Sequence, residues 1–230
     1  MNSGSANLLA HLRTLSDPAK AAEMAAYHKT TREFLGISAQ ILDEMARDLR
    51  RDHDVPVRCD MARDLWDCDI HETRILAAKL LTQARMRPDD AAAWDLIATW
   101  AQDFDSWALA DHAAIAGAKR LQADPARLEQ VADWIAHTNM WTRRAALVMT
   151  LPLARLPHPK AGDIAAREQV LGWAEQLVPD RDRFIQKAIA WWLRDLSRRN
   201  PDRVRQFLAG PGAALSLPAQ REAARNLPPA

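Results

Sequence analysis

Two side chains that could act on a positively charged group stand four residues apart near the middle of the chain. Trp107 precedes Asp111 by four residues, and on an α-helix this spacing places both side chains on one face. An indole ring attracts cations and a carboxylate stabilises positive charge, so the pair suits a cationic substrate or transition state. The structural alternative is that Trp107 lies in the core and Asp111 is a solvated or capping acid. The same alternative applies to Trp141 and Trp191.

A second group of side chains could hold an anion. Residues 139–144 read NMWTRR, which is typical of a helix start, where backbone N–H groups and the guanidinium groups of Arg143 and Arg144 could bind phosphate. A surface ion pair is the alternative for these arginines. Lys187 lies four residues before Trp191, on the same helical face. We expect Lys187 to contact phosphate as well.

Several common reaction types have no motif in this chain. There is no Gly-rich phosphate loop, no GxSxG elbow, no HExxH and no cluster with metal-ligand spacing, which argues against nucleotide hydrolysis, serine hydrolysis and zinc chemistry. The two cysteines, Cys59 and Cys68, are too few for a disulfide framework and we expect them to be reduced. His28, His112 and His137 have no ligand pattern around them and receive no role. We expect neither a metal nor a cofactor.

The elements that must position these residues are helices. Seven glycines and one tyrosine among 230 residues, with abundant alanine, leucine and arginine, favour helix over strand. Apolar residues recur at helical spacing, as at Ile185, Ile189, Trp192 and Leu196. Prolines beside capping residues divide the pattern into short helices; these breaks are Asp17-Pro18, Arg87-Pro88-Asp89, Asp124-Pro125, Asn200-Pro201 and Pro211-Gly212.

A weak internal repeat indicates how the helices are organised. Similar segments begin at positions 72, 107, 141 and 184, a spacing near the roughly 40-residue unit of HEAT-type helix pairs. Stacked pairs form a curved solenoid with a concave face. We therefore predict an all-α, HEAT-like solenoid that forms one domain over residues 1–230. The stretch from Pro152 to Gly162 is the candidate connection between two halves, or a plain surface loop.

The net charge of +1 conceals an asymmetry between the two ends of the chain. Residues 1–180 hold 21 Lys and Arg against 26 Asp and Glu, a balance of −5, whereas residues 181–230 hold 10 against 4, a balance of +6. A basic end could face nucleic acid, although a solvated helix surface would look the same. No apolar run reaches the length of a membrane span and the start lacks signal-peptide features, so we expect a cytoplasmic protein.

Three motifs together resemble the AlkD family of DNA alkylation-repair glycosylases, which are built from HEAT-like repeats. They are SWxxxD from Ser106 to Asp111, DWIAHTNMWTRRAAL at 133–147 and FIQKAIAWWLRD at 184–195. The resemblance extends from the segment that contains Tyr27 to the region after Ser216. One departure follows Gly36-Ile37, where the family commonly has a proline a few residues on and this chain reads SAQI. That departure concerns the N-terminal DNA contact rather than the chemistry.

The resemblance implies a DNA glycosylase that needs no cofactor. In the family, two tryptophans, a catalytic aspartate and an arginine line the cleft, and these correspond by motif position to Trp107, Trp191, Asp111 and Arg144. Asp111 would stabilise the sugar cation and orient water, the tryptophans would pack on the deoxyribose, and Arg144 would hold phosphate. Arg143, Lys187 and Tyr27 are expected to add DNA contacts. The implied substrate is duplex DNA with N3- or N7-alkylated purines, acted on without base flipping by a monomer.

Two other functions fit the same sequence. A noncatalytic HEAT-repeat module could bind DNA or protein through its concave face, although the presence of Asp111 argues against lost catalysis. A helical protein-binding scaffold without a nucleic-acid role would make the basic end and the tryptophans incidental. Weak binding to duplex DNA at low salt would favour the scaffold.

Overall fold

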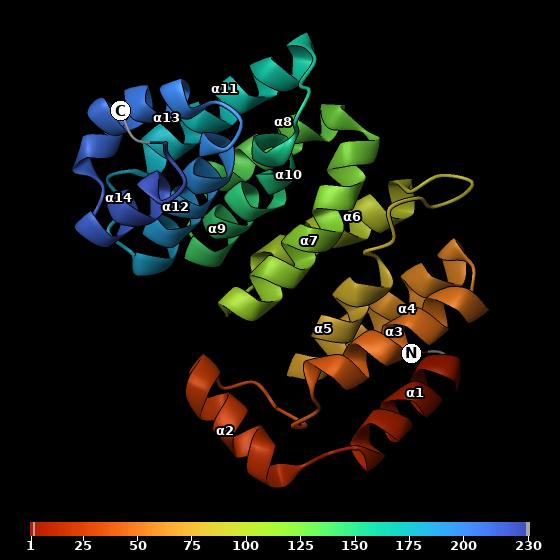
Figure 1. The fold of residues 1–230 in the computed structure, drawn as a ribbon. Helices are drawn as coiled ribbons and strands as arrows, with labels where there is room; N and C mark the ends of the chain where they lie inside the picture. The colour runs from red at the N-terminus through yellow and green to blue at the C-terminus, as the bar shows by residue number, and fades with distance from the viewer. Residues whose placement is uncertain (2, 229–230) are drawn as a thin grey trace. The chain divides into compact units, whose positions relative to one another are not determined.

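The computed structural model describes residue 1 and residues 3–228, and it is built from helices (Figure 1). Among the described residues the one β-type pairing is an isolated parallel bridge between Glu33 and Ile70. Internal contacts group the chain into two compact units, Met1–Ala123 and Asp124–Ala230. None of the helices in the described part combines the length and apolar character that a membrane span requires. The predicted all-α class is confirmed.

Helix α5, at the centre of the first unit, is buried on almost every side. It packs against α3, α4 and α7, and of its ten residues all but Lys79 are buried. Its first turn places four polar residues, 71–74, in this interior. The elements of the unit are α1 (Ser3–Thr14), α2 (Pro18–His28), α3 (Ala39–Asp52), α4 (Val55–Asp67), α5 (His71–Leu80), α6 (Ala91–Thr99), the 3-10 turn η1 (Trp100–Asp103) and α7 (Trp107–Ala123).

Helix α12 has the central place in the second unit. It packs against α9, α10, α11, α13 and α14 and buries Ile185, Ile189, Trp192 and Leu196, the residues whose spacing predicted this helix. The elements of the unit are η2 (Pro125–Arg127), α8 (Leu128–Ala132), η3 (Asp133–Ala136), α9 (Met140–Met149), α10 (Leu151–Arg155), α11 (Ala161–Leu177), α12 (Arg183–Ser197), α13 (Pro201–Ala209), η4 (Pro211–Ala214) and α14 (Leu217–Ala224).

The predicted repeat and four of the five predicted breaks fall at helix starts, whereas Arg87-Pro88-Asp89 lies in the connection before α6. Asp17 and Asn200 cap α2 and α13 through their side chains, each followed by a proline in the first turn. Repeat positions 72, 107, 141 and 184 lie within one residue of the first residues of α5, α7, α9 and α12. The predicted connection at residues 152–162 does not separate the units, because the boundary lies at 123/124 and α10 occupies part of that stretch. The single domain, the solenoid and its concave face remain predictions.

A buried carboxylate fastens the chain between α2 and α3 to the start of α5. Glu72 is fully buried, and its Oε atoms accept hydrogen bonds from the backbone N–H groups of Leu35 (2.9 Å), Gly36 (2.7 Å) and Ile37 (3.3 Å). Next to it, the N–H of His71 donates to the carbonyl of Glu33 at 2.9 Å. Charge-assisted hydrogen bonds of this kind are stronger than neutral ones. They hold residues 33–37 against α5.

Gly36 permits this crossing for two reasons. Its φ is +78°, a conformation that L-residues rarely adopt. A Cβ atom at this position would lie 2.2 Å from the carbonyl oxygen of Asp17 and 2.7 Å from the backbone N of Ala21. The segment therefore passes the start of α2 at a distance that excludes any side chain.

Gly36→Ala should lower the free energy of unfolding by about 2 kcal/mol or more, because backbone strain and a clash with backbone atoms add together. Urea denaturation measures this change. Gly172→Ala is the matched control, since Gly172 lies within α11 and a Cβ atom there would meet nothing within 4 Å; that variant should gain up to about 1 kcal/mol from helix propensity. Equal stability of the two variants would contradict this account of Gly36.

Candidate functional site

Trp107 and Asp111 lie on one helix, as their spacing predicted. Trp107 is the first residue of α7 and Asp111 follows one turn later. Both side chains are partly exposed, whereas most residues between and after them are buried. Trp107 is therefore not a fully buried core residue, because part of its side chain is accessible at the N-terminal end of α7.

Two rings from the end of α2 hold the Trp107 indole. The His28 ring lies 5.3 Å from it between centroids at an interplanar angle of 32°, and the Tyr27 ring meets it edge-on at 6.2 Å and 87°. Tyr27 and His28 also meet edge to face, at 5.1 Å and 84°. Tyr27 is 70% exposed, so the pair of rings that contacts Trp107 is open to solvent at Tyr27.

A second layer of rings lies behind His28. His71, at the start of α5, lies 4.7 Å from the His28 ring, and Phe34 stacks on both histidines at 5.8 Å and 4.5 Å. His28 thus contacts all four of the other rings in this group, which we call the ring cluster: Tyr27, His28, Phe34, His71 and Trp107. His28 has no ligand pattern around it in the sequence, and no motif marks His71. The adjacency of His28 to Tyr27 was the one available signal.

An arginine–aspartate pair fixes the turn that precedes α7. Asp105 accepts hydrogen bonds from Arg32 Nε (3.1 Å) and Nη2 (2.9 Å) and from the Thr30 hydroxyl (3.0 Å). Arg32 also pairs with Asp69, just before α5. Because Asp105 lies two residues before Trp107, these bonds tie the start of α7 to the segment that follows His28.

Burial keeps the histidines around Trp107 neutral. It lowers the pKa of His71 to about 3, helped by the positive charge that His28, His112 and Arg32 can carry. Burial also lowers the pKa of His28, an effect that the charge of Asp105 partly opposes. The pKa of His112 is lowered by burial too, against a hydrogen bond with the Ala108 carbonyl. Near neutral pH the ring cluster therefore adds no positive charge beside Trp107.

The second unit places cations on its own tryptophan. The guanidinium carbon of Arg144 lies 4.8 Å from the centre of the Trp191 ring, and Nζ of Lys187 lies 5.0 Å from it. Arg144 is the fifth residue of α9, whereas Lys187 and Trp191 lie one turn apart on α12. Each contact is a cation–π interaction, worth about 0.5 to 2 kcal/mol according to its exposure. The shared helical face predicted for Lys187 and Trp191 is confirmed.

Arg144, the predicted phosphate contact, is almost completely buried. It is 1% exposed, and its Nη1 donates to the Phe184 carbonyl at 2.8 Å. Arg143 is also engaged: it donates to the carbonyls of His137 (2.7 Å) and Thr138 (2.9 Å) and pairs with a carboxylate, Asp180, at 2.8 Å. The expected helix start is present, with the Asn139 side chain capping α9.

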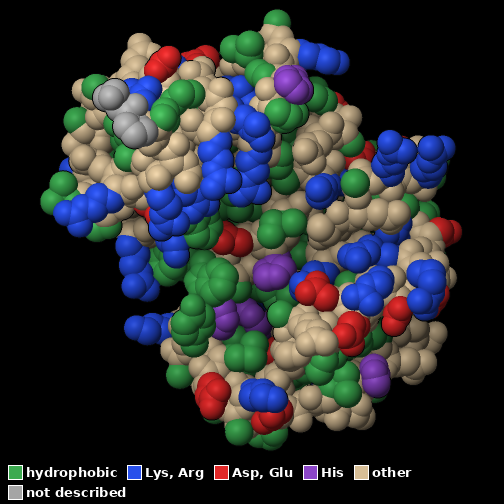
Figure 2. Space-filling model, in the orientation of Figure 1, with side chains coloured by type: hydrophobic (Ala, Val, Ile, Leu, Met, Phe, Trp, Pro, Cys, Tyr) green, Lys and Arg blue, Asp and Glu red, His purple; other side chains and the backbone are tan. Residues whose placement is uncertain are grey.

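Exposed basic residues give the second unit a positive surface. Figure 2 shows Lys and Arg side chains gathered over the face of this unit that the view presents. On α12 and next to it, the exposed members are Arg181, Arg183, Lys187, Arg198 and Arg199. The +6 balance of residues 181–230 therefore lies partly on the helix that carries Trp191.

Comparison with known proteins gives the same family as the three sequence motifs around Trp107, Arg144 and Trp191. A family model described as DNA alkylation repair enzyme matches residues 8–227. The chain belongs to this family. It is AlkD-like, as the sequence motifs predicted. No curated protein matches the sequence.

Solved structures share the fold of this family member at low sequence identity. A predicted DNA alkylation repair enzyme from Enterococcus faecalis superposes with a TM-score of 0.75 at 22% identity, covering 94% of this chain and 98% of that one. AlkD2 from Streptococcus mutans gives 0.62 at 16%, with 84% and 92% covered. The protein smu.31 from Streptococcus mutans UA159 gives 0.61 at 17%, with 82% and 92% covered.

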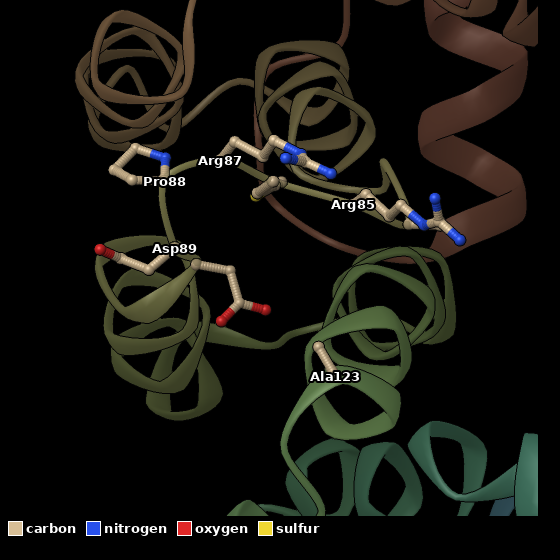
Figure 3. Close-up of a pocket in the computed structure, with 8 residues that line it drawn as sticks. Arg85, Arg87, Pro88, Asp89 and Ala123 are labelled. Carbon is tan, nitrogen blue, oxygen red and sulfur yellow. The ribbon is translucent and has the colours of Figure 1, made fainter.

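A separate hollow of about 400 Å³ lies at the connection from α5 to α6 (Figure 3). Arg85 and Arg87 line it together with Asp89, and Ala123 contributes from the end of α7. None of the residues predicted for the site lines this hollow. Its lining contains arginine and aspartate side chains but no tryptophan. It therefore lacks an aromatic ring that could attract a cation, as Trp107 in the ring cluster could.

The low pKa of His71 predicts how stability depends on pH. The unfolded chain binds a proton at this residue below about pH 6.5, but the folded chain does so only near pH 3. The free energy of unfolding should therefore fall as pH drops through this window. His71→Phe keeps a ring but removes the proton uptake, so urea denaturation should show a smaller loss between about pH 7 and pH 5. The control is His158→Phe at an exposed histidine; a His71→Phe curve parallel to wild type would refute the prediction.

Proposed function

We propose that this family member is a monofunctional DNA glycosylase that removes positively charged N3- or N7-alkylated purines from duplex DNA. The observation that carries the proposal is the placement of Trp107 and Asp111 one turn apart on α7, both accessible, with the indole held by the ring cluster. Membership of the DNA alkylation repair family supports it. The reaction is base excision repair of alkylation damage and needs no cofactor.

The chemistry follows from the charge of the lesion. An alkylated purine is cationic, so when the bond between C1′ and the base nitrogen breaks, the base leaves as a neutral molecule and positive charge develops on the sugar. The Asp111 carboxylate stabilises that charge and orients a water whose oxygen bonds to C1′. The proton of this water passes to solvent. The products are the free base and an intact strand with an abasic site.

The tryptophans act on the sugar rather than on the base. Trp107 and Trp191 would pack against the deoxyribose and attract its developing positive charge through their ring faces. The lesion then stays stacked in the duplex, unlike in glycosylases that extrude the target base. This role of the two tryptophans is part of the proposal.

The basic residues divide into two roles. Lys187 is exposed beside Trp191, and we assign it to the DNA backbone, where lysine charge adds sequence-independent affinity. Arg144 is buried against the same ring, which supports a role in fixing Trp191; a phosphate contact of Arg144 stays a prediction. Arg143 and Tyr27 stay predicted DNA contacts.

Asp111→Asn should lower the rate of base release by about 100-fold or more, because the amide lacks the negative charge that stabilises the sugar cation. Duplex binding should change less than about twofold, since binding depends on the basic residues. Release of 7-methylguanine from methylated duplex, measured in single turnover, gives the rate. Asp95→Asn, at an exposed carboxylate of α6 in the same unit, is the matched control. Near-normal release by Asp111→Asn would place catalysis elsewhere.

The charge of the lesion provides a second test of the proposal. Duplexes that contain 7-methylguanine or 3-methyladenine should lose the damaged base, whereas duplexes with uracil or hypoxanthine should not, because a neutral base needs a general acid to leave. Base release is measured on each duplex under identical conditions. Excision of a neutral base, or a borohydride-trapped Schiff base that reveals a lysine nucleophile, would overturn the mechanism.

A further inference from the structure

Helix α2 presents its end to Trp107 although none of its residues is buried. The helix spans Pro18–His28, and its last two residues, Tyr27 and His28, supply the two rings that contact the Trp107 indole. Burial of apolar side chains is what normally fixes a helix in place. For α2, the ring contacts of its last turn take over much of that function.

His28 links the two layers of the ring cluster. Its ring centroid lies 5.3 Å from that of Trp107, and 4.7 Å and 5.8 Å from those of His71 and Phe34. Its Nδ1 atom is buried and has no hydrogen-bond partner among the described residues. The ring therefore contributes through its shape and its faces rather than through a polar contact at Nδ1.

We propose that His28 is a positioning residue: its uncharged ring docks the end of α2 onto the ring cluster and sets the orientation of the Trp107 indole that meets the substrate. This inference rests on the proposed function of Trp107. His28 lies outside the three sequence motifs that resemble the family, whereas Trp107, the residue that it positions, lies in the first of them. The role is specific to an aromatic ring without charge.

The charges around His28 explain why the ring must stay neutral. Asp105, before α7, is the acidic group that acts on it. His71 of α5 adjoins it directly, and burial keeps both His71 and His112 uncharged near neutral pH, so Arg32, which acts on His71, is the cation of this region. Lys29 follows His28 in the chain. A proton on His28 would place a cation against the indole that should attract the positive charge developing on the sugar, so acid should weaken both docking and catalysis.

The test compares His28→Ala with His28→Phe in the full-length protein. His28→Ala removes the ring and should lower the single-turnover rate of 7-methylguanine release by about 10- to 100-fold through misplacement of Trp107. His28→Phe should recover most of that rate at neutral pH. Because burial lowers the pKa of His28, wild type should lose rate only at pH values below the usual imidazole pKa of about 6.5, and His28→Phe should lose less there.

A second measurement does not depend on glycosylase activity. Trypsin cleavage after Lys20 and Lys29, at the two ends of α2, reports how often the helix opens. His28→Ala should be cleaved faster than wild type and His28→Phe at a similar rate to wild type, with thermal melting to confirm that all variants fold. His11→Phe on α1, an exposed histidine, is the control in both assays.

The outcomes separate the two proposals. Suppose that wild type releases no base, while trypsin cleaves His28→Ala faster than wild type and His28→Phe at the wild-type rate. The proposed glycosylase function is then wrong, and the docking role of His28 stands. If wild type releases base and His28→Ala matches it in rate and in cleavage, the positioning role is wrong. A folded His28→Phe variant that behaves like His28→Ala in both assays would also overturn it, because the ring alone would then not suffice.

Discussion

The buried carboxylate of Glu72 is the interaction on which the rest of the first unit depends. Its three hydrogen bonds fix residues 35–37 to the start of α5. Phe34 precedes this segment and His71 adjoins Glu72, so the same bonds bring together the two stacked rings behind His28. A carboxylate this deep is stable only because backbone N–H groups replace its water, each such bond to a charged group contributing about 1.5 to 3 kcal/mol. The placement of the rings behind Trp107 therefore depends on the hydrogen bonds of Glu72.

Both units surround a tryptophan with supporting side chains, but they do so with opposite chemistry. Trp107 is held by uncharged rings, and burial disfavours protonation of the two histidines among them. Trp191 is held by two cations, one buried and one exposed. In the proposed reaction the first tryptophan therefore remains free to attract positive charge, whereas the ring face of the second is already partly used by Arg144 and Lys187. Of the two tryptophans, Trp191 should therefore attract the developing charge of the sugar less strongly than Trp107.

Local patterns in the sequence were enough to place the helices and the faces of the predicted site residues. The four-residue spacings of Trp107 with Asp111 and of Lys187 with Trp191 needed only the period of the helix. The ring cluster could not be predicted in this way, because His28, Phe34 and His71 come from three segments that meet only in the fold. The burial of Arg144 was hidden for a related reason: an arginine stacked on an indole has the same sequence signature as one in solvent. The unit boundary at Asp124-Pro125 looked like any other proline break.

The four consecutive buried polar residues at the start of α5 also constrain how the gene can vary in length. Each residue added to a helix rotates everything beyond it by about 100°. An insertion within residues 71–74 would turn Glu72 away from the N–H groups of residues 35–37, or Arg74 away from the carbonyl of Trp66 to which it donates at 3.0 Å. Both changes would leave a charge buried without its partner, and neighbouring helices on every side prevent α5 from rotating back. Insertions and deletions should therefore be tolerated far better in the connection at residues 83–90, where the chain is mostly exposed. The first turn of α5 should tolerate them least.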